Sequence, residues 1–241
     1  MILLLYFKEK LFVKINYFLE ACISGILFHG IYLGGVFYSI SLGLPANIAA
    51  LIVSLQPILT NIFAGPILKE QVTWIQWLGI ALGFIGAILV LGFDIGKSIS
   101  IISLIACIAA LLAVTTATLW QKLLSNKLSL IVNNFYQALG ASIFLFFIMI
   151  IFENPSINFN TSFILSMSWQ IIIISFGAFT ILMYLIKVGT ASRTSNLFFL
   201  VPATSAIMAW FFLDEVITSI DILGFFISSI GVYIATRTFK I

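Results

Sequence analysis

Polar side chains recur at a regular spacing within the apolar segment around residue 50. Asn47, Ser54 and Asn61 are joined by small residues at steps of three and four. At 3.6 residues per turn these positions share one face of a helix, while Leu, Ile and Phe cover the opposite side. Polar groups in such surroundings form hydrogen bonds with a bound molecule or with a neighbouring helix. We therefore expect this face to line a polar cavity, with close helix packing as the alternative.

Further side chains within apolar segments are candidates for the same cavity. His29 is the only histidine, and an ionisable group at this depth is costly unless it faces a cavity or a partner. Because a neutral histidine costs less than a charged group, a hydrogen-bonded packing role is the alternative. The remaining candidates are Tyr32, Thr180, Tyr184 and Ser195.

Two prolines lie near the centres of apolar segments, at Pro57 and Pro202. Each removes a backbone hydrogen bond and is expected to kink its helix. We interpret both as structural hinges, with direct contact to a bound molecule as the less favoured role.

The residue types needed for enzyme chemistry are not grouped in this chain. No apolar segment has Asp or Glu at its centre, and there is no phosphate-binding loop, His/Cys cluster or Ser/His/Asp set. Cys22 and Cys107 lie within apolar segments and predict no disulfide. We therefore expect no enzyme activity, metal, cofactor or nucleic-acid partner, with a polytopic membrane enzyme as a minor alternative.

The elements that carry these residues are predicted to be membrane-spanning helices. The chain is 62% hydrophobic and 8% charged, and apolar runs of about 20 residues follow one another with short polar breaks. Since unpaired backbone groups are costly in lipid, these runs must be helical. The predicted spans are 18–42, 45–68, 72–93, 98–121, 132–152, 168–190, 192–213 and 217–236.

The breaks between these spans differ in charge. Ten of the eleven basic residues fall in alternate breaks, together with the two ends of the chain, whereas Lys97 lies in the other set with Asp94, Glu153, Asp214 and Glu215. Basic residues next to membrane helices stay on the cytoplasmic side. We therefore expect an integral membrane protein, of the bacterial inner (plasma) membrane, with its C-terminus in the cytoplasm.

The chain also contains a duplication. Residues 46–86 recur at 191–231 with a shift of 145 and no gap, and identical residues include the paired prolines, Glu70 with Glu215, and Thr73 with Thr218. Five crossings separate equivalent positions, so the second copy is predicted to be inverted relative to the first. The repeats are expected at 1–93 and 94–241.

The same shift predicts that the first copy is shorter than the second. Five-helix units then leave eight full transmembrane helices and an N-terminal stub at Met1–Phe7, with the first helix and most of the second lacking. The paired Glu70 and Glu215 stand just before a helix, as a cap would.

The repeated segment resembles the EamA-type repeat of the drug/metabolite transporter superfamily. The matching features are a mid-helix proline, Leu-x-Glu at the helix end, a following Thr, and Gly-x6-Gly in the next helix; they occur in LQPILTNIFAGPILKEQVTWIQWLGIALGFIG and again in LVPATSAIMAWFFLDEVITSIDILGFFISSIG. This resemblance implies ten helices in two inverted sets of five and transport of small metabolites.

We therefore expect a secondary transporter that moves a small organic metabolite, such as an amino acid, nucleoside or drug-like molecule, by alternating access between inverted repeats. A truncated, transport-inactive relative is the alternative. The expected partners are the small-molecule substrate and the lipid bilayer. The GxxxG spacing of Gly79 and Gly83 also allows a homodimer, although the first interpretation of these glycines is a face for close helix packing.

Overall fold

The computed structural model describes residues 13–92, 99–153, 158–213 and 217–237, and the regular structure within these ranges is helical throughout. Seven helical segments of the described chain are long and apolar enough to cross a membrane. They are Ile15–Ser41, Ala46–Leu68, Trp74–Leu91, Ile101–Leu124 (α7), Leu130–Phe152 (α8), Thr161–Val188 and Ser219–Thr236. The prediction of an all-α polytopic membrane protein is confirmed.

The predicted span 192–213 is helical but is not one of these seven. It consists of α11 (Ala191–Asn196), the 3-10 turn η3 (Leu197–Leu200) and α12 (Val201–Leu213). The predicted span 168–190 begins earlier than expected, at Thr161, because the Asn160 side chain caps the helix there by accepting a hydrogen bond from the Phe163 N–H. The stub expected at Met1–Phe7 lies outside the described residues.

Two crossings contain π-helical turns at the same register of the repeat. The first is α2 (Ile15–Gly25), η1 (Ile26–Leu33) and α3 (Gly34–Ser41), and the second is α9 (Thr161–Ser168), η2 (Trp169–Ala178) and α10 (Phe179–Val188). The shift of 145 places Ile26–Leu33 on residues 171–178, within η2. The correspondence between the copies therefore extends upstream of the segment where residue identities showed it.

Both proline-bearing helical segments are interrupted directly before the proline. A turn at Ser54–Leu55 separates α4 (Ala46–Val53) from α5 (Gln56–Leu68), in which Pro57 is the second residue. In the second copy, η3 ends immediately before α12, in which Pro202 is the second residue. A proline cannot donate to the carbonyl four residues earlier, so an unbroken helix through either site would lose that hydrogen bond.

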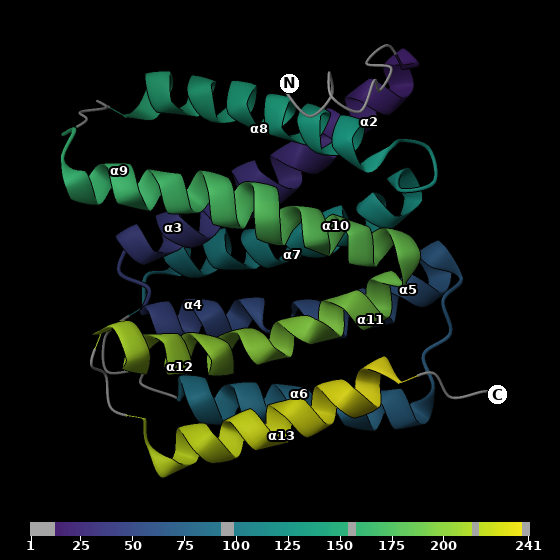
Figure 1. Ribbon diagram of the computed structural model, residues 1–241, viewed down its shortest axis with the longest axis vertical. Coiled ribbons are helices and arrows are strands. Elements are labelled where there is room, and N and C mark those ends of the chain that lie inside the picture. The colour runs from purple at the N-terminus through teal and green to yellow at the C-terminus, as the bar shows by residue number, and fades with distance from the viewer. Residues whose placement is uncertain (1–12, 93–98, 154–157, 214–216, 238–241) are drawn as a thin grey trace.

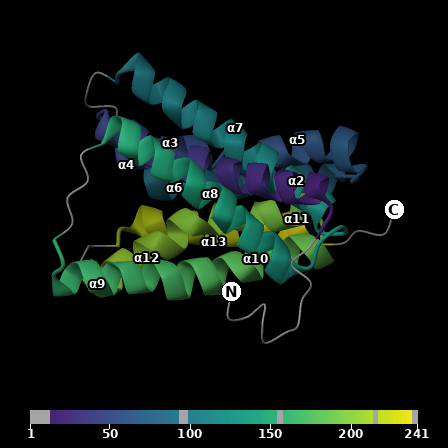
Figure 2. The same ribbon diagram turned by 90° about the horizontal axis from the view of Figure 1, so that it is seen from above.

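Helices α6 (Trp74–Leu91) and α13 (Ser219–Thr236) pack against each other through glycines, and Figures 1 and 2 both show them side by side. A Cβ atom on Gly79 would lie 2.7 Å from the carbonyl oxygen of Gly231, and one on Gly86 would lie 2.6 Å from that of Gly224. The sequence position rises along α6 as it falls along α13, so the two equivalent helices are antiparallel. The glycine face that suggested a homodimer is thus buried within the chain.

The described basic residues gather at one end of the bundle. They occur where α2 begins, after α5, between α7 and α8, around the α10–α11 turn and after α13, and Figure 1 shows these helix ends on the right. They are Lys14, Lys69, Lys122, Lys127, Lys187, Arg193 and Arg237. Glu153 lies at the opposite end, after α8. The two sets of breaks predicted from charge therefore occupy opposite ends of the molecule.

The expectation that Glu70 caps the helix that follows it is wrong. That helix, α6, begins with a capping box in which Thr73 and Gln76 bond each other's backbone N–H groups, and Thr218 and Asp221 form the equivalent box at α13. Glu70 instead bonds α11, which lies in the other copy. Glu215 is outside the described residues.

Candidate functional site

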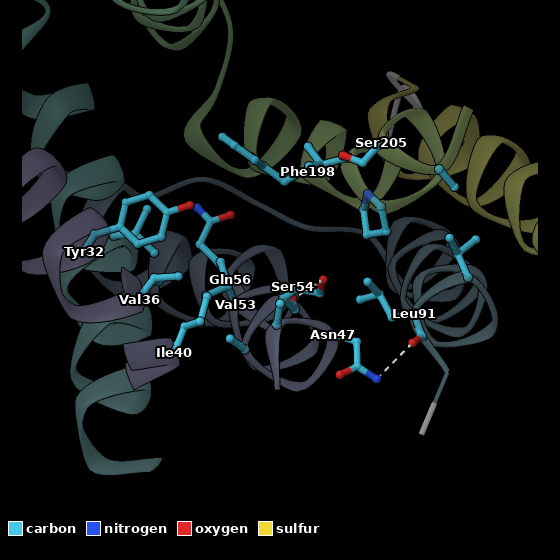
Figure 3. A pocket seen from close by; sticks show the side chains of 18 residues that line it. Tyr32, Val36, Ile40, Asn47, Val53, Ser54, Gln56, Leu91, Phe198 and Ser205 are labelled. Atoms are coloured by element: carbon cyan, nitrogen blue, oxygen red, sulfur yellow. Dashed lines mark hydrogen bonds between the residues drawn. The ribbon is translucent and has the colours of Figure 1, made fainter. Parts of the chain in front are cut away.

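A cavity of about 560 Å³ lies between the two copies of the repeat, a size typical of small-molecule sites. Its walls come from η1 and α3, α4, the start of α5, the end of α6, α7, η3 and α12 (Figure 3). The polar residues among the eighteen that line it are Tyr32, Asn47, Ser54, Gln56 and Ser205. None of the eighteen carries a formal charge.

Helix α4 forms one wall of the cavity because small residues on its face leave room. Five residues of α4 line the space, among them Asn47 and Ala50, and so does Ser54 directly after the helix. The Ser54 hydroxyl donates to the carbonyl of Ala50 at 2.8 Å, and Asn47 Nδ2 donates to the carbonyl of Leu91 on α6 at 3.4 Å. The first half of the predicted polar face is therefore a cavity wall.

The second half of that face packs against the other copy instead. Asn61 is buried, and its Nδ2 donates to Asn196 Oδ1 at 2.7 Å and to the carbonyl of Pro57 at 2.7 Å. Asn196 in turn donates to the carbonyl of Ala235 at 3.5 Å. Both interpretations of the polar face thus apply, one on each side of the break at Ser54–Leu55.

The second copy supplies the opposite wall through Phe198 and Ser205 (Figure 3). Pro202 also lines the cavity. Ser195, predicted for the cavity, is fully buried one turn before this wall. Its hydroxyl donates to the carbonyl of Ser192 at 2.8 Å. Ser195 therefore supports the helix rather than lining the space.

The remaining predicted residues lie in three different settings. Tyr32 lines the cavity from the π-helical segment η1. His29 is half-buried outside the lining, with its ring centroid 4.5 Å from that of Phe179 and 5.5 Å from that of Phe28. Thr180 and Tyr184 are exposed on the outer surface of α10. A role of these four residues in substrate binding stays a prediction.

Gln56 is a cavity residue that the helix-face argument missed. It follows the break and precedes Pro57, and its side chain is only 2% exposed. Its Nε2 donates to Thr60 Oγ1 at 3.2 Å and to Thr118 Oγ1 at 3.3 Å, whereas its Oε1 has no hydrogen-bond partner in the described structure. An amide in the middle of an apolar segment, next to a helix-breaking proline, was the available signal.

Glu70 closes the end of the bundle that is distant from the cavity. Its Oε1 accepts from the N–H of Ala191 at 2.9 Å, and its Oε2 accepts from the N–H and the hydroxyl of Ser192 at 3.0 and 2.6 Å. A carboxylate at a helix N-terminus satisfies free N–H groups and stabilises the helix dipole. Glu70 thereby ties the end of α5 to the start of α11, across the boundary between the copies.

Lys122 holds the other side of the same turn. Its Nζ donates to the carbonyl oxygens of Ile186 and Lys187 at 2.9 and 3.2 Å and also to that of Gly189. These are the free carbonyls at the C-terminal end of α10, where a cation is favourable. The α10–α11 turn is therefore fixed by a carboxylate on one side and an ammonium on the other.

The chain is similar to a family of transporters and to one named relative. The model of the EamA-like transporter family matches residues 1–92 and 100–237. The uncharacterized transporter YvbV of Bacillus subtilis (strain 168) is 26% identical over 204 residues, which are 84% of this chain and 65% of YvbV. The chain thus spans slightly less than two thirds of that relative.

The fold also occurs in a protein of known crystal structure. The two structures align with a TM-score of 0.70 and 18% identity, over 91% of this chain and 85% of the other. At this identity the likeness concerns the fold alone.

Proposed function

The chain belongs to the EamA-like transporter family, as its repeated motifs predicted, and on this premise we propose that it is a secondary transporter of a small organic metabolite. In this proposal residues 1–93 and 94–241 are inverted repeats. The cavity between them holds the substrate, and rocking of the repeats exposes the cavity to each side of the membrane in turn.

The glycine contacts between α6 and α13 are the observation that carries this proposal. Under the shift of 145, Gly79 corresponds to Gly224 and Gly86 to Gly231. Gly79 meets Gly231, and Gly86 meets Gly224. Replacing each glycine by its equivalent in the other copy therefore turns the first contact into the second. Such reciprocal contacts are the mark of a two-fold axis, here relating two antiparallel halves of one chain.

The sealed end of the bundle supports alternating access. The cavity is lined by residues near the end opposite the basic residues, including Asn47 and Leu91. Towards the basic end, the Asn61–Asn196 hydrogen bond and the Glu70 contacts join the copies. In the proposed mechanism these contacts separate when the cavity opens to the other side, while the helix breaks before the prolines absorb the bending.

We propose that the sealed end faces the cytoplasm of a bacterial inner membrane. This orientation follows from the basic residues gathered there, including Lys69 and Lys122, because such residues remain on the cytoplasmic side. The conformation of this structure is then closed towards the cytoplasm.

A single-cysteine accessibility experiment tests the proposal. Cys22 and Cys107 are replaced by alanine, Ser205→Cys is introduced into the cavity wall, and an impermeant maleimide is added to right-side-out and inside-out vesicles. Asn126→Cys, in the turn between α7 and α8, and Asn158→Cys, before α9, report the two membrane faces. The proposal predicts labelling at position 205 from both sides and labelling of each control from one side. Labelling at 205 from a single side contradicts alternating access and favours a transport-inactive relative.

A further inference from the structure

The cavity contains a hydrogen-bond acceptor that the helix-face prediction did not include, the side-chain carbonyl of Gln56. The inference drawn from it rests on the proposed function, because it concerns what the same cavity selects. Gln56 lines the cavity at the junction of α4 and α5, and Figure 3 shows its side chain among the lining residues that include Tyr32 and Phe198.

The hydroxyl of Thr118 fixes the orientation of this amide. Thr118 Oγ1 donates its proton to the carbonyl of Val114 at 2.8 Å, so towards Gln56 it can only accept. The group of Gln56 that faces it must therefore be the Nε2 amide, which is the assignment at 3.3 Å. With Nε2 also bonded to Thr60, Oε1 is the end of the amide that remains for another partner.

Two polar side chains of the α4 wall do not bond this acceptor. The hydroxyl of Ser54 and the amide of Asn47 donate to backbone carbonyls instead. Gln56 Oε1 is buried and has no hydrogen-bond partner among the described residues. A buried acceptor without a donor is unfavourable, and a substrate donor relieves this on binding.

The described lining offers no counter-charge to a charged substrate. Its side chains are uncharged, and most are apolar, among them Val36, Ile40 and Val53 of the first copy. Taking a charge from water into such a site without a counter-charge is strongly unfavourable. A free amino acid brings two full charges, whereas a nucleoside or an uncharged drug-like molecule brings none.

We propose that Gln56 determines substrate specificity: its carbonyl accepts a hydrogen bond from an N–H or O–H group of an uncharged substrate with an apolar or aromatic body. Thr118 and Thr60 act as positioning residues by holding the amide nitrogen away from the substrate. Sites that hydrogen-bond a substrate group discriminate strongly against analogues that lack it, because their own polar group is then left unpaired.

Matched pairs of neutral ligands test this role. In the Ser205→Cys protein, protection from N-ethylmaleimide measures occupancy of the cavity itself. The probes are 9-methyladenine with N6,N6,9-trimethyladenine, benzamide with N,N-dimethylbenzamide, and phenylalanine as the charged comparison. We expect the member with an N–H donor to protect at about tenfold lower concentration, the ratio for about 1.4 kcal/mol. Gln56→Met is expected to bring each pair within about twofold, whereas the surface control Gln170→Met keeps the preference.

A second variant covers the case in which Gln56→Met does not fold. Thr118→Val keeps the shape of the side chain but frees the amide to rotate, and it is expected to reduce the preference for the donor-bearing probes. The inference is overturned if the two members of each pair protect equally, or if no neutral probe protects. It is also overturned if phenylalanine alone protects, or if the preference survives both variants. Labelling of position 205 from both membrane sides is measured without any probe. If that two-sided labelling persists, the transport proposal stands while the role of Gln56 fails; labelling from one side ends the transport proposal itself.

Discussion

Replacing Glu70 with alanine removes the carboxylate that joins α5 to α11. Two N–H groups and one hydroxyl lose their acceptor, at distances of 2.6 to 3.0 Å in the intact protein. Hydrogen bonds to charged groups contribute about 1.5–3 kcal/mol each when buried. Glu70 is half-exposed, so in the variant water replaces part of the stabilisation that these hydrogen bonds give. We therefore take about 2 kcal/mol as the total loss for the three contacts.

This loss should shift the balance between the two access states. If the contacts exist only when the basic end is closed, about 2 kcal/mol corresponds to a roughly 30-fold larger population of the state open at that end. The measured quantity is the rate at which Ser205→Cys reacts with an impermeant maleimide from the cytoplasmic side. We expect that rate to rise by the same order, with a smaller rise for Glu70→Gln, which keeps one acceptor oxygen.

Glu153→Gln is the matched control, because Glu153 is exposed at the opposite end of the bundle. It should leave both labelling rates unchanged. Equal cytoplasmic labelling in the Glu70→Ala and parent proteins refutes the reasoning, even if the variant is less stable. A fall in the thermal midpoint alone would show that Glu70 supports the fold in all states.

Two further substitutions test the packing. In Gly79→Ala the new Cβ would lie 2.5 Å from the backbone nitrogen of Ala235, so overpacking of α6 against α13 should cost about 1–3 kcal/mol and lower the midpoint of thermal unfolding in detergent. Gly34→Ala, where a Cβ meets nothing within 4 Å, should not lower it; equal midpoints for the two variants would contradict the packing argument. Lys122→Met leaves the last carbonyls of α10 without their ammonium and should also lower the midpoint, by more than the same change at the exposed Lys14. Indistinguishable effects at the two lysines would remove the proposed role of Lys122.

The repeat made much of the fold predictable from the sequence. Identical prolines and glycines at one register predict equivalent local structure, and the helix breaks before Pro57 and Pro202 and the glycine packing of α6 on α13 agree with this. The early start at Thr161 was missed because polar residues within the first turns resembled a break, although they lie on an exposed helical surface.

The site was predicted less completely because a helix face is continuous only while the helix is. The face drawn through Asn47 and Asn61 assumed unbroken geometry, but the turn at Ser54–Leu55 changes the register. Beyond that turn Gln56 lines the cavity and Asn61 bonds Asn196. The partner of Glu70 is about 120 residues away in the sequence, and no local pattern indicates such a contact.

The central claim is that the closed end of this bundle opens. It is tested most directly by double electron–electron resonance between two spin labels in the otherwise cysteine-free protein. One label replaces Gln71, which follows α5, and the other replaces Lys187, which lies near the end of α10. The account predicts two distance populations, a major short one and a minor longer one, with the longer population growing in Glu70→Ala. A single distance that Glu70→Ala leaves unchanged would contradict it.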